Sequence, residues 1–275
     1  MASYAFRQVD VFPGGPLGGN PLAVVIGADG LAEQRMRDFA RWTNLSETTF
    51  LLAPEDARAD YRVRIFTPAE ELPFAGHPTL GSAAVWAEAT GSRSSTFVQE
   101  CGVGLVTLRR TPSGIAFAAP PLLRSGAATD AERIAAAASL RLDPDDLGEA
   151  EWVDNGPGWL AVALADAGAV LAVDPDFGAM PFPLGVVGRH EPGGPADFEV
   201  RAFVPGLGVP EDPVTGSLNA GIATWFLRDG IVPGGYTVRQ GTAIGRDGLV
   251  SIERDDEGIW VGGAVAPVVE GTVTL

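Results

Sequence analysis

The sequence contains no lysine, because all 19 of its basic residues are arginines. Without a lysine amine, the chain cannot form a Schiff base with a carbonyl substrate or with pyridoxal phosphate. Acidic residues number 35 and the formal net charge is −16, which repels the phosphate backbone of nucleic acids. We therefore expect no nucleic-acid partner.

Cysteine and histidine are also scarce. Cys101 is the only cysteine, so the chain can form neither an internal disulfide nor a two-thiol racemase site. His77 and His190 lie far apart and lack the paired ligand spacing of a zinc site. The glycine-rich segment 13–20 lacks the spacing of a nucleotide-binding loop and is typical of a turn. We expect no metal and no cofactor.

Long apolar runs are missing as well. No stretch approaches the roughly 20 residues needed to span a membrane. The first residues, MASYAFRQVDVF, do not combine a basic start with an apolar segment as a secretory signal does. We expect no membrane association and a cytoplasmic location.

The residues that are abundant indicate a globular, strand-rich protein. Apolar residues make up 46% of 275 residues, and the 36 glycines and 22 prolines indicate many turns between short elements. In the first half we expect helices at 31–42 and 78–89 and strands at 4–12, 21–26, 49–52, 61–66, 96–99, 103–109 and 114–118.

The proline pair at 120–121 predicts a domain boundary. A capping box over 129–132 predicts a helix that ends near residue 140. In the second half we further expect a helix at 216–228 and strands at 159–164, 184–188, 198–203, 236–240, 249–254 and 258–261.

Two short motifs occur once in each half. Residues 64–68 match 201–205 as R-x-F-x-P, and residues 77–82 match 212–217 as [HD]-P-x-x-G-S. Their order and similar separation predict two copies of one α+β unit that share a cleft. Each motif proline is expected in the first turn of a helix, whose free N–H groups and dipole favour an anionic ligand. By this alignment, His77 and Asp212 would stand where loops meet the cleft.

Three segments carry a family resemblance. NLSETTFL at 44–51, ELPFAGHPTLGSA at 71–83 and GVPEDPVTGSLNAG at 208–221 resemble the phenazine-biosynthesis PhzF family, which is similar to diaminopimelate epimerase in fold. The resemblance implies two pseudo-symmetric domains, each a curved, mostly antiparallel, barrel-like sheet wrapped around a central helix. The expected domains are 1–118, completed by a C-terminal strand at 264–275, and 119–263.

The resemblance also implies the roles of particular residues. Glu47 corresponds to the family's acid–base residue, and His77 and Asp212 correspond to its polar partners. Substrate contacts are implied for Ser46, Gly76, Gly216 and Ser217. A single carboxylate then takes a proton from one carbon and returns it to another, which requires an environment that raises its pKa.

The implied activity is that of trans-2,3-dihydro-3-hydroxyanthranilate isomerase in phenazine-type biosynthesis, acting on a small anionic substrate without a cofactor. Two alternatives stay open: a one-base racemase or isomerase of another small acid, and a non-catalytic protein that binds such an acid. Exposed edges in a strand-rich fold often pair across a twofold axis, so we expect a homodimer.

Overall fold

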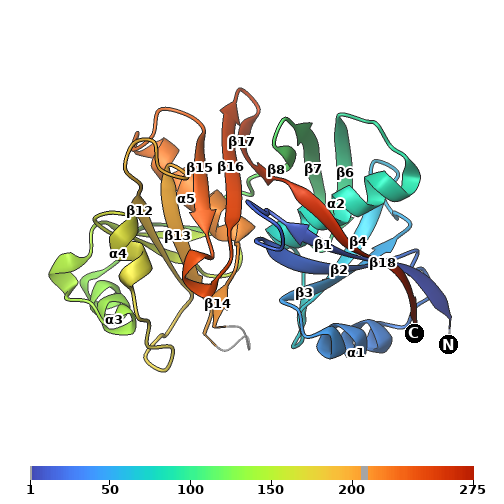
Figure 1. Cartoon of the computed structure of the whole chain (residues 1–275), viewed down its shortest axis with the longest axis horizontal. Coiled ribbons are helices and arrows are strands. Elements are labelled where there is room, and N and C mark those ends of the chain that lie inside the picture. Colours follow the sequence, from blue (N-terminus) through green and yellow to red (C-terminus); the bar gives the residue numbers. More distant parts are fainter. Residues whose placement is uncertain (1, 206–209) are drawn as a thin grey trace. The chain divides into compact units, whose positions relative to one another are not determined.

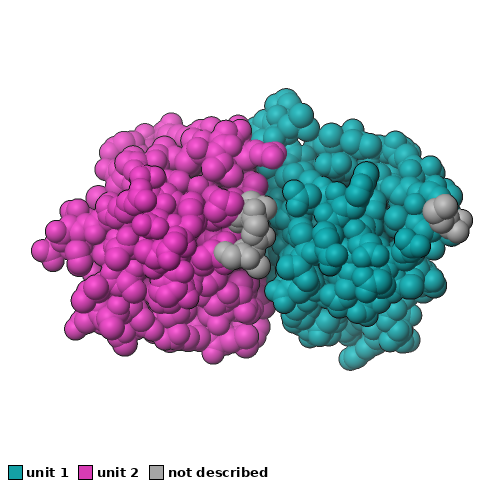
Figure 2. Space-filling view, turned by 90° about the horizontal axis from the view of Figure 1, so that it is seen from below, with its two compact units in different colours: residues 1–118, 262–275 teal, residues 119–261 magenta. Residues whose placement is uncertain are grey.

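The computed structural model describes residues 2–205 and 210–275. The chain divides into two compact units, unit 1 with residues 1–118 and 262–275 and unit 2 with residues 119–261 (Figure 2). Both consist of strands with few helices, which confirms the predicted α+β class. Two residues of the motif at 208–221, Gly208 and Val209, lie outside the described residues. No helix in the described ranges has the length and apolar composition needed to cross a membrane.

Unit 1 is an eight-strand ladder (Figure 1). Its order is β18 (Val265–Thr274), β1 (Ser3–Val11), β2 (Asn20–Ile26), β3 (Glu47–Leu52), β4 (Tyr61–Phe66), β6 (Thr96–Cys101), β7 (Gly104–Thr111) and β8 (Gly114–Ala118). The β2–β3 and β4–β6 pairs are parallel and the others are antiparallel. Each parallel pair needs a crossover connection, which contains α1 (Glu33–Thr43) in the first case and α2 (Gly76–Thr90) in the second.

The two helices of unit 1 differ in their burial. α1 buries one face through Met36, Phe39 and Ala40 and ends at Asn44, whose φ of 54° is left-handed. In contrast, α2 has buried residues on all sides and contacts β1, β2, β3, β4, β6, β8 and β18. It is therefore the central helix around which this ladder curves.

Unit 2 repeats this topology. Its ladder runs β9 (Arg124–Ala127), β10 (Ala150–Asp154), β11 (Leu160–Ala163), β12 (Leu184–Arg189), β13 (Phe198–Phe203), β15 (Tyr236–Gln240) and β16 (Gly248–Asp255), and β17 (Gly258–Gly263) follows. As in unit 1, the third and fifth pairs of neighbouring strands, here β11–β12 and β13–β15, are parallel. Their connections contain α4 (Ala167–Ala172) and α5 (Gly216–Arg228).

Unit 2 also contains helices outside these connections. α3 (Asp130–Leu140) begins with the predicted capping box, in which Thr129 and Glu132 bond each other's backbone N–H. Short 3₁₀ helices follow at η1 (Pro144–Asp146) and η2 (Thr242–Ile244). The strands β9 and β10 and the helix α4 were not expected from the sequence.

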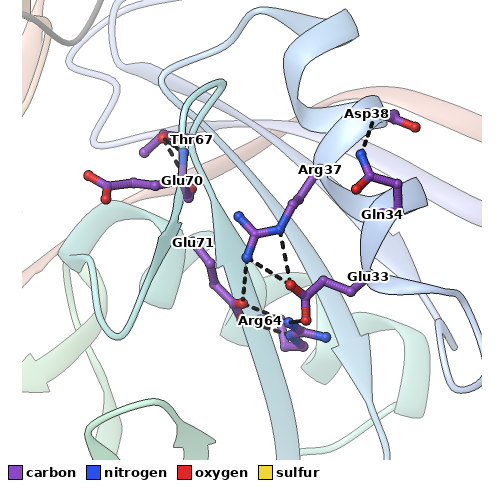
Figure 3. A network of polar contacts seen from close by, with 8 residues as sticks. All are labelled: Glu33, Gln34, Arg37, Asp38, Arg64, Thr67, Glu70 and Glu71. Atoms are coloured by element: carbon purple, nitrogen blue, oxygen red, sulfur yellow. Dashed lines mark hydrogen bonds and ion pairs between the residues drawn. The ribbon is translucent and has the colours of Figure 1, made fainter.

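The first repeat motif marks equivalent positions in the two units. Arg64 in β4 pairs with Glu71 in β5 (Glu71–Leu72), and Arg201 in β13 pairs with Glu211 in β14 (Glu211–Asp212). Both arginines bind the carboxylate through two nitrogens. The Arg64 pair belongs to a wider surface network that includes Glu33 and Arg37 (Figure 3).

The second motif match is a wrong alignment. Gly81 lies in the middle of α2, whereas Gly216 is the first residue of α5. Aligned by their helix starts, Gly76 matches Gly216 and Gly81 matches Gly221. The last pair has the same packing role, because an added Cβ would lie 2.5 Å from Leu22 Cδ2 at Gly81 and 2.4 Å from the Val153 carbonyl oxygen at Gly221. His77 is thus the counterpart of Ser217 and not of Asp212.

Candidate active site

In unit 1, the structure brings Glu47 and His77 into contact. Glu47 is the first residue of β3 and His77 is the second residue of α2. Glu47 Oε2 lies 3.3 Å from His77 Nε2, and the side chains are 15% and 4% exposed. The predicted helix start at residue 78 is two residues late, since α2 begins at Gly76 and His77 belongs to its buried first turn. A carboxylate with partial access to solvent is therefore held against an enclosed imidazole.

Asn20, the first residue of β2, completes this group. Its Nδ2 lies 3.3 Å from His77 Nδ1. An amide nitrogen can only donate, so Nδ1 accepts and the ring hydrogen belongs on Nε2, next to Glu47. Burial lowers the pKa of His77 to about 3. At neutral pH the ring is therefore an uncharged donor.

The start of α2 offers further donors beside this group. Its N-cap is Ala75, whose side chain cannot cap, and its first turn contains no acidic residue. The N–H groups of Gly76 and His77 precede the first internal helical bond, which Thr79 makes to the Ala75 carbonyl. Uncapped N–H groups and the helix dipole favour a negative charge here. The half-buried Ser46 directly precedes Glu47.

In unit 2, Asp212 is the last residue of β14 and is held by two neighbours. Thr215 Oγ1 donates to Asp212 Oδ2 at 2.5 Å, and Gln240 Nε2 donates to the Asp212 carbonyl oxygen at 3.1 Å. Gln240 Oε1 also accepts from the Thr215 N–H at 3.0 Å. The prediction that Pro213 lies in the first helical turn is wrong, because α5 begins at Gly216.

Ser217 is the second residue of α5, directly after Gly216. Its Oγ accepts a hydrogen bond from Trp159 Nε1 at 3.0 Å, and its carbonyl oxygen accepts one from Asn155 Nδ2 at 2.8 Å. The serine hydroxyl hydrogen is therefore directed away from the indole donor. Like α2, α5 begins without a side-chain cap or an acidic residue in its first turn.

Only one unit has a carboxylate at the position of Glu47. Thr48 pairs with Phe66 across β3 and β4, and Leu184 pairs with Phe203 across β12 and β13. Because Phe66 and Phe203 are equivalent in the first repeat motif, Leu184 is the counterpart of Thr48, and Pro183, directly before it, is the counterpart of Glu47. Cys101 lies at the end of β6, far in sequence from both helix starts, and burial raises the pKa of its thiol. Within the described residues, no cluster of three or more His, Cys, Asp or Glu could hold a metal ion.

Sequence reasoning did not identify Asn20, Thr215 or Gln240 as site residues. Asn20 and Gln240 lie next to glycines and are completely buried. Burial is the property that requires such amides to have partners, but it follows from the fold. The available signal for Asn20 was its position, because it is a polar residue between a glycine-rich turn and an apolar run.

Comparison with known proteins identifies relatives along the whole chain. The family model described as phenazine biosynthesis-like protein matches residues 9–271. The chain is 34% identical to trans-2,3-dihydro-3-hydroxyanthranilate isomerase of Pseudomonas chlororaphis, over 88% of this chain and 87% of that protein. It is also 34% identical to an uncharacterized isomerase of Mesorhizobium japonicum, over the full length of both.

Solved structures agree with these matches. A phenazine biosynthesis protein of the PhzF family from Enterococcus faecalis superposes with a TM-score of 0.83 at 26% identity, covering 100% of both chains. A predicted epimerase from Pseudomonas aeruginosa gives 0.79 at 27% identity and 99% coverage of both. A hydroxyproline epimerase from Agrobacterium vitis shares the fold, with a TM-score of 0.59 at 13% identity over 99% of this chain and 91% of that one.

Proposed function

Since this chain belongs to the phenazine biosynthesis-like family and is an isomerase, we propose that it moves a proton between two carbons of a small cyclic amino or carboxylic acid without a cofactor. The relatives named trans-2,3-dihydro-3-hydroxyanthranilate isomerase make that compound the first substrate to test. The contact between the Glu47 carboxylate and the buried His77 ring is the observation that carries this proposal.

In the proposed reaction, Glu47 is first a base and then an acid. Its carboxylate takes a proton from one carbon of the substrate and, as a carboxylic acid, returns it to another carbon on the same face. His77 stays neutral and keeps its Nε2 hydrogen beside Oε2, with 3.3 Å between the nitrogen and the oxygen, which favours one orientation of the carboxylate. The other oxygen, Oε1, is then the atom that carries the proton.

Two features favour one base over two. A two-base racemase needs a second acid–base group on the opposite face of the substrate, and the counterpart of Glu47 in unit 2 is Pro183, which has no ionisable side chain. The lone thiol of Cys101 has a raised pKa and is therefore a poor thiolate. A proton that leaves and returns through one carboxylate is consistent with both.

The negative charge of the substrate needs hydrogen-bond donors or positive charge to bind it in this lysine-free, acidic protein. We assign its carboxylate to uncapped helix N–H groups, such as those of Gly76 and His77 at the start of α2. Asp212 and Ser217 are proposed to orient the amino and hydroxyl groups of the substrate, with Gly216 and Ser46 as further contacts.

The test is the conversion of trans-2,3-dihydro-3-hydroxyanthranilate by the wild-type protein and by Glu47→Gln in D₂O, followed by absorbance and product mass. Glutamine keeps the shape of the side chain but cannot take up a proton. We expect the variant to lose at least about 10²-fold in kcat, as is usual for removal of a general base. Little deuterium in the early wild-type product would show that the carboxylate returns the same proton.

Glu149→Gln is the matched control, because it makes the same chemical change on an exposed side chain and should leave the rate unchanged. If the wild type binds this compound without converting it, a panel of other small cyclic acids follows. Binding without conversion or solvent exchange across that panel contradicts an isomerase role. Full activity of Glu47→Gln contradicts the assignment of the base.

A further inference from the structure

We infer that Asn20 is a positioning residue, which sets the tautomer of His77 and thereby directs an N–H donor at Glu47. This inference rests on the proposed function for its effect on catalysis. Its structural part, the location of one hydrogen on an imidazole ring, can be tested without any substrate.

Asn20 is held rigidly enough to set a hydrogen-bond direction. It is 0% exposed and pairs with Val11 across β1 and β2. The preceding Gly19 donates its N–H to the buried Asp10 carboxylate at 3.2 Å. A Cβ on Gly19 would lie 2.1 Å from the Val11 carbonyl oxygen. The backbone before Asn20 thus passes too close to β1 for any side chain, and the amide approaches His77 from one direction.

The direction of this contact decides the state of the ring. A neutral imidazole has one N–H and one lone pair, and the amide nitrogen of Asn20 can only meet the lone pair. With Nδ1 as acceptor, the hydrogen is on Nε2. This nitrogen lies 3.3 Å from Glu47 Oε2. The other tautomer would place N–H against N–H at Asn20 and a lone pair against a carboxylate at Glu47. Both contacts would be repulsive.

The protein is well suited to a direct measurement, because it contains only two histidines. Long-range ¹H–¹⁵N correlation spectra of the ¹⁵N-labelled wild type distinguish a protonated from an unprotonated ring nitrogen. We expect His77 to show Nε2–H with an unprotonated Nδ1 at neutral pH, and His190→Gln assigns the signals. A wild-type His77 with Nδ1–H, or with a mixture of tautomers, would overturn the inference, whether or not the protein is active.

Asn20→Asp tests the cause. The carboxylate has nearly the shape of the amide but presents an acceptor to Nδ1, so the ring must place a hydrogen there. We expect His77 to show Nδ1–H or a doubly protonated ring, and kcat to fall by about 10²-fold with a smaller change in KM. Asn20→Ala, which removes the donor without adding charge, should give mixed tautomers. Melting curves establish that each variant is folded.

His190 provides an internal control in the same spectra. Its Nε2 lies 3.0 Å from Glu199 Oε2 in unit 2, whereas Asn20 belongs to unit 1. Its signals should be identical in all variants. If folded Asn20 variants keep the wild-type tautomer of His77, or change it and keep the wild-type kcat, Asn20 is not a positioning residue. If Glu47→Gln is fully active, the proposed base fails while the tautomer result stands.

Discussion

At the scale of single residues, the uncharged state of His77 links the candidate site to stability. Burial lowers the pKa of His77 to about 3 from an ordinary value of 6.5. Below pH 6.5 the unfolded chain binds a proton that the folded chain does not. The free energy of unfolding should therefore be largest above this pH and fall as the pH drops toward 3, by up to about 1.4 kcal/mol per pH unit.

His77→Gln should remove this dependence, because glutamine does not titrate. Between about pH 7.5 and about pH 5, the wild type should lose about 2 kcal/mol more than the variant. Urea unfolding of both proteins at each pH measures the difference. Equal losses would mean that the folded protein protonates His77 readily, which contradicts an enclosed neutral ring.

The sequence identified residues of this site, but it did not predict the contacts between them. Glu47 and His77 were identified from the motifs that contain them, and the structure places them in contact. The role of Asn20 could not be predicted, because a 3.3 Å contact between residues 57 positions apart depends on how β2 lies beside α2. The catalytic roles of Glu47, His77 and Asp212 stay predictions, as do the substrate contacts of Ser46, Gly76, Gly216 and Ser217.

At the scale of elements, one repeated ion pair occurs in two environments. Arg64 and Glu71 join β4 to β5 on a surface, with side chains 26% and 29% exposed. Arg201 and Glu211 join β13 to β14 in the same way, but are 6% and 7% exposed. Arg201 Nη1 also donates to the carbonyl oxygens of Val170 and Val173 at the end of α4.

This difference predicts unequal effects for the same substitution. Arg201→Met leaves a buried carboxylate and two carbonyl groups without their donor, and should destabilise the protein by about 3–5 kcal/mol. Arg64→Met leaves groups that water can reach, and should cost no more than about 1 kcal/mol. Denaturant unfolding of the two variants gives the comparison, and similar losses would contradict it.

The same contrast shows which elements the sequence could predict. Strands with alternating or continuous apolar patterns, such as Tyr61–Phe66 and Phe198–Phe203, were predicted with the observed bounds. The two-residue strands β5 and β14 and the six-residue helix α4 are too short to produce a period. They are stabilised by contacts with distant segments, and the arginine pairs are one such contact.

At the scale of the whole molecule, the last strand of the chain pairs with the first. β18 pairs with β1 along its entire length, from Ser3 with Thr274 to Val11 with Val265. Most side chains of β18 are exposed, so its main contribution to unit 1 is backbone hydrogen bonding. Without β18, β1 would become an unpaired edge over the central helix α2.

Deletion of residues 264–275 should therefore affect unit 1 far more than unit 2. We expect amide hydrogen exchange to show lost protection in β1 and β2, while the strands of unit 2 keep theirs. The control is Val269→Thr, which changes an exposed side chain of β18 but keeps its backbone bonds and should preserve protection throughout. If the deletion leaves β1 and β2 protected, unit 1 is stable without its last strand. If Val269→Thr exposes them as well, side-chain packing rather than backbone pairing stabilises this edge.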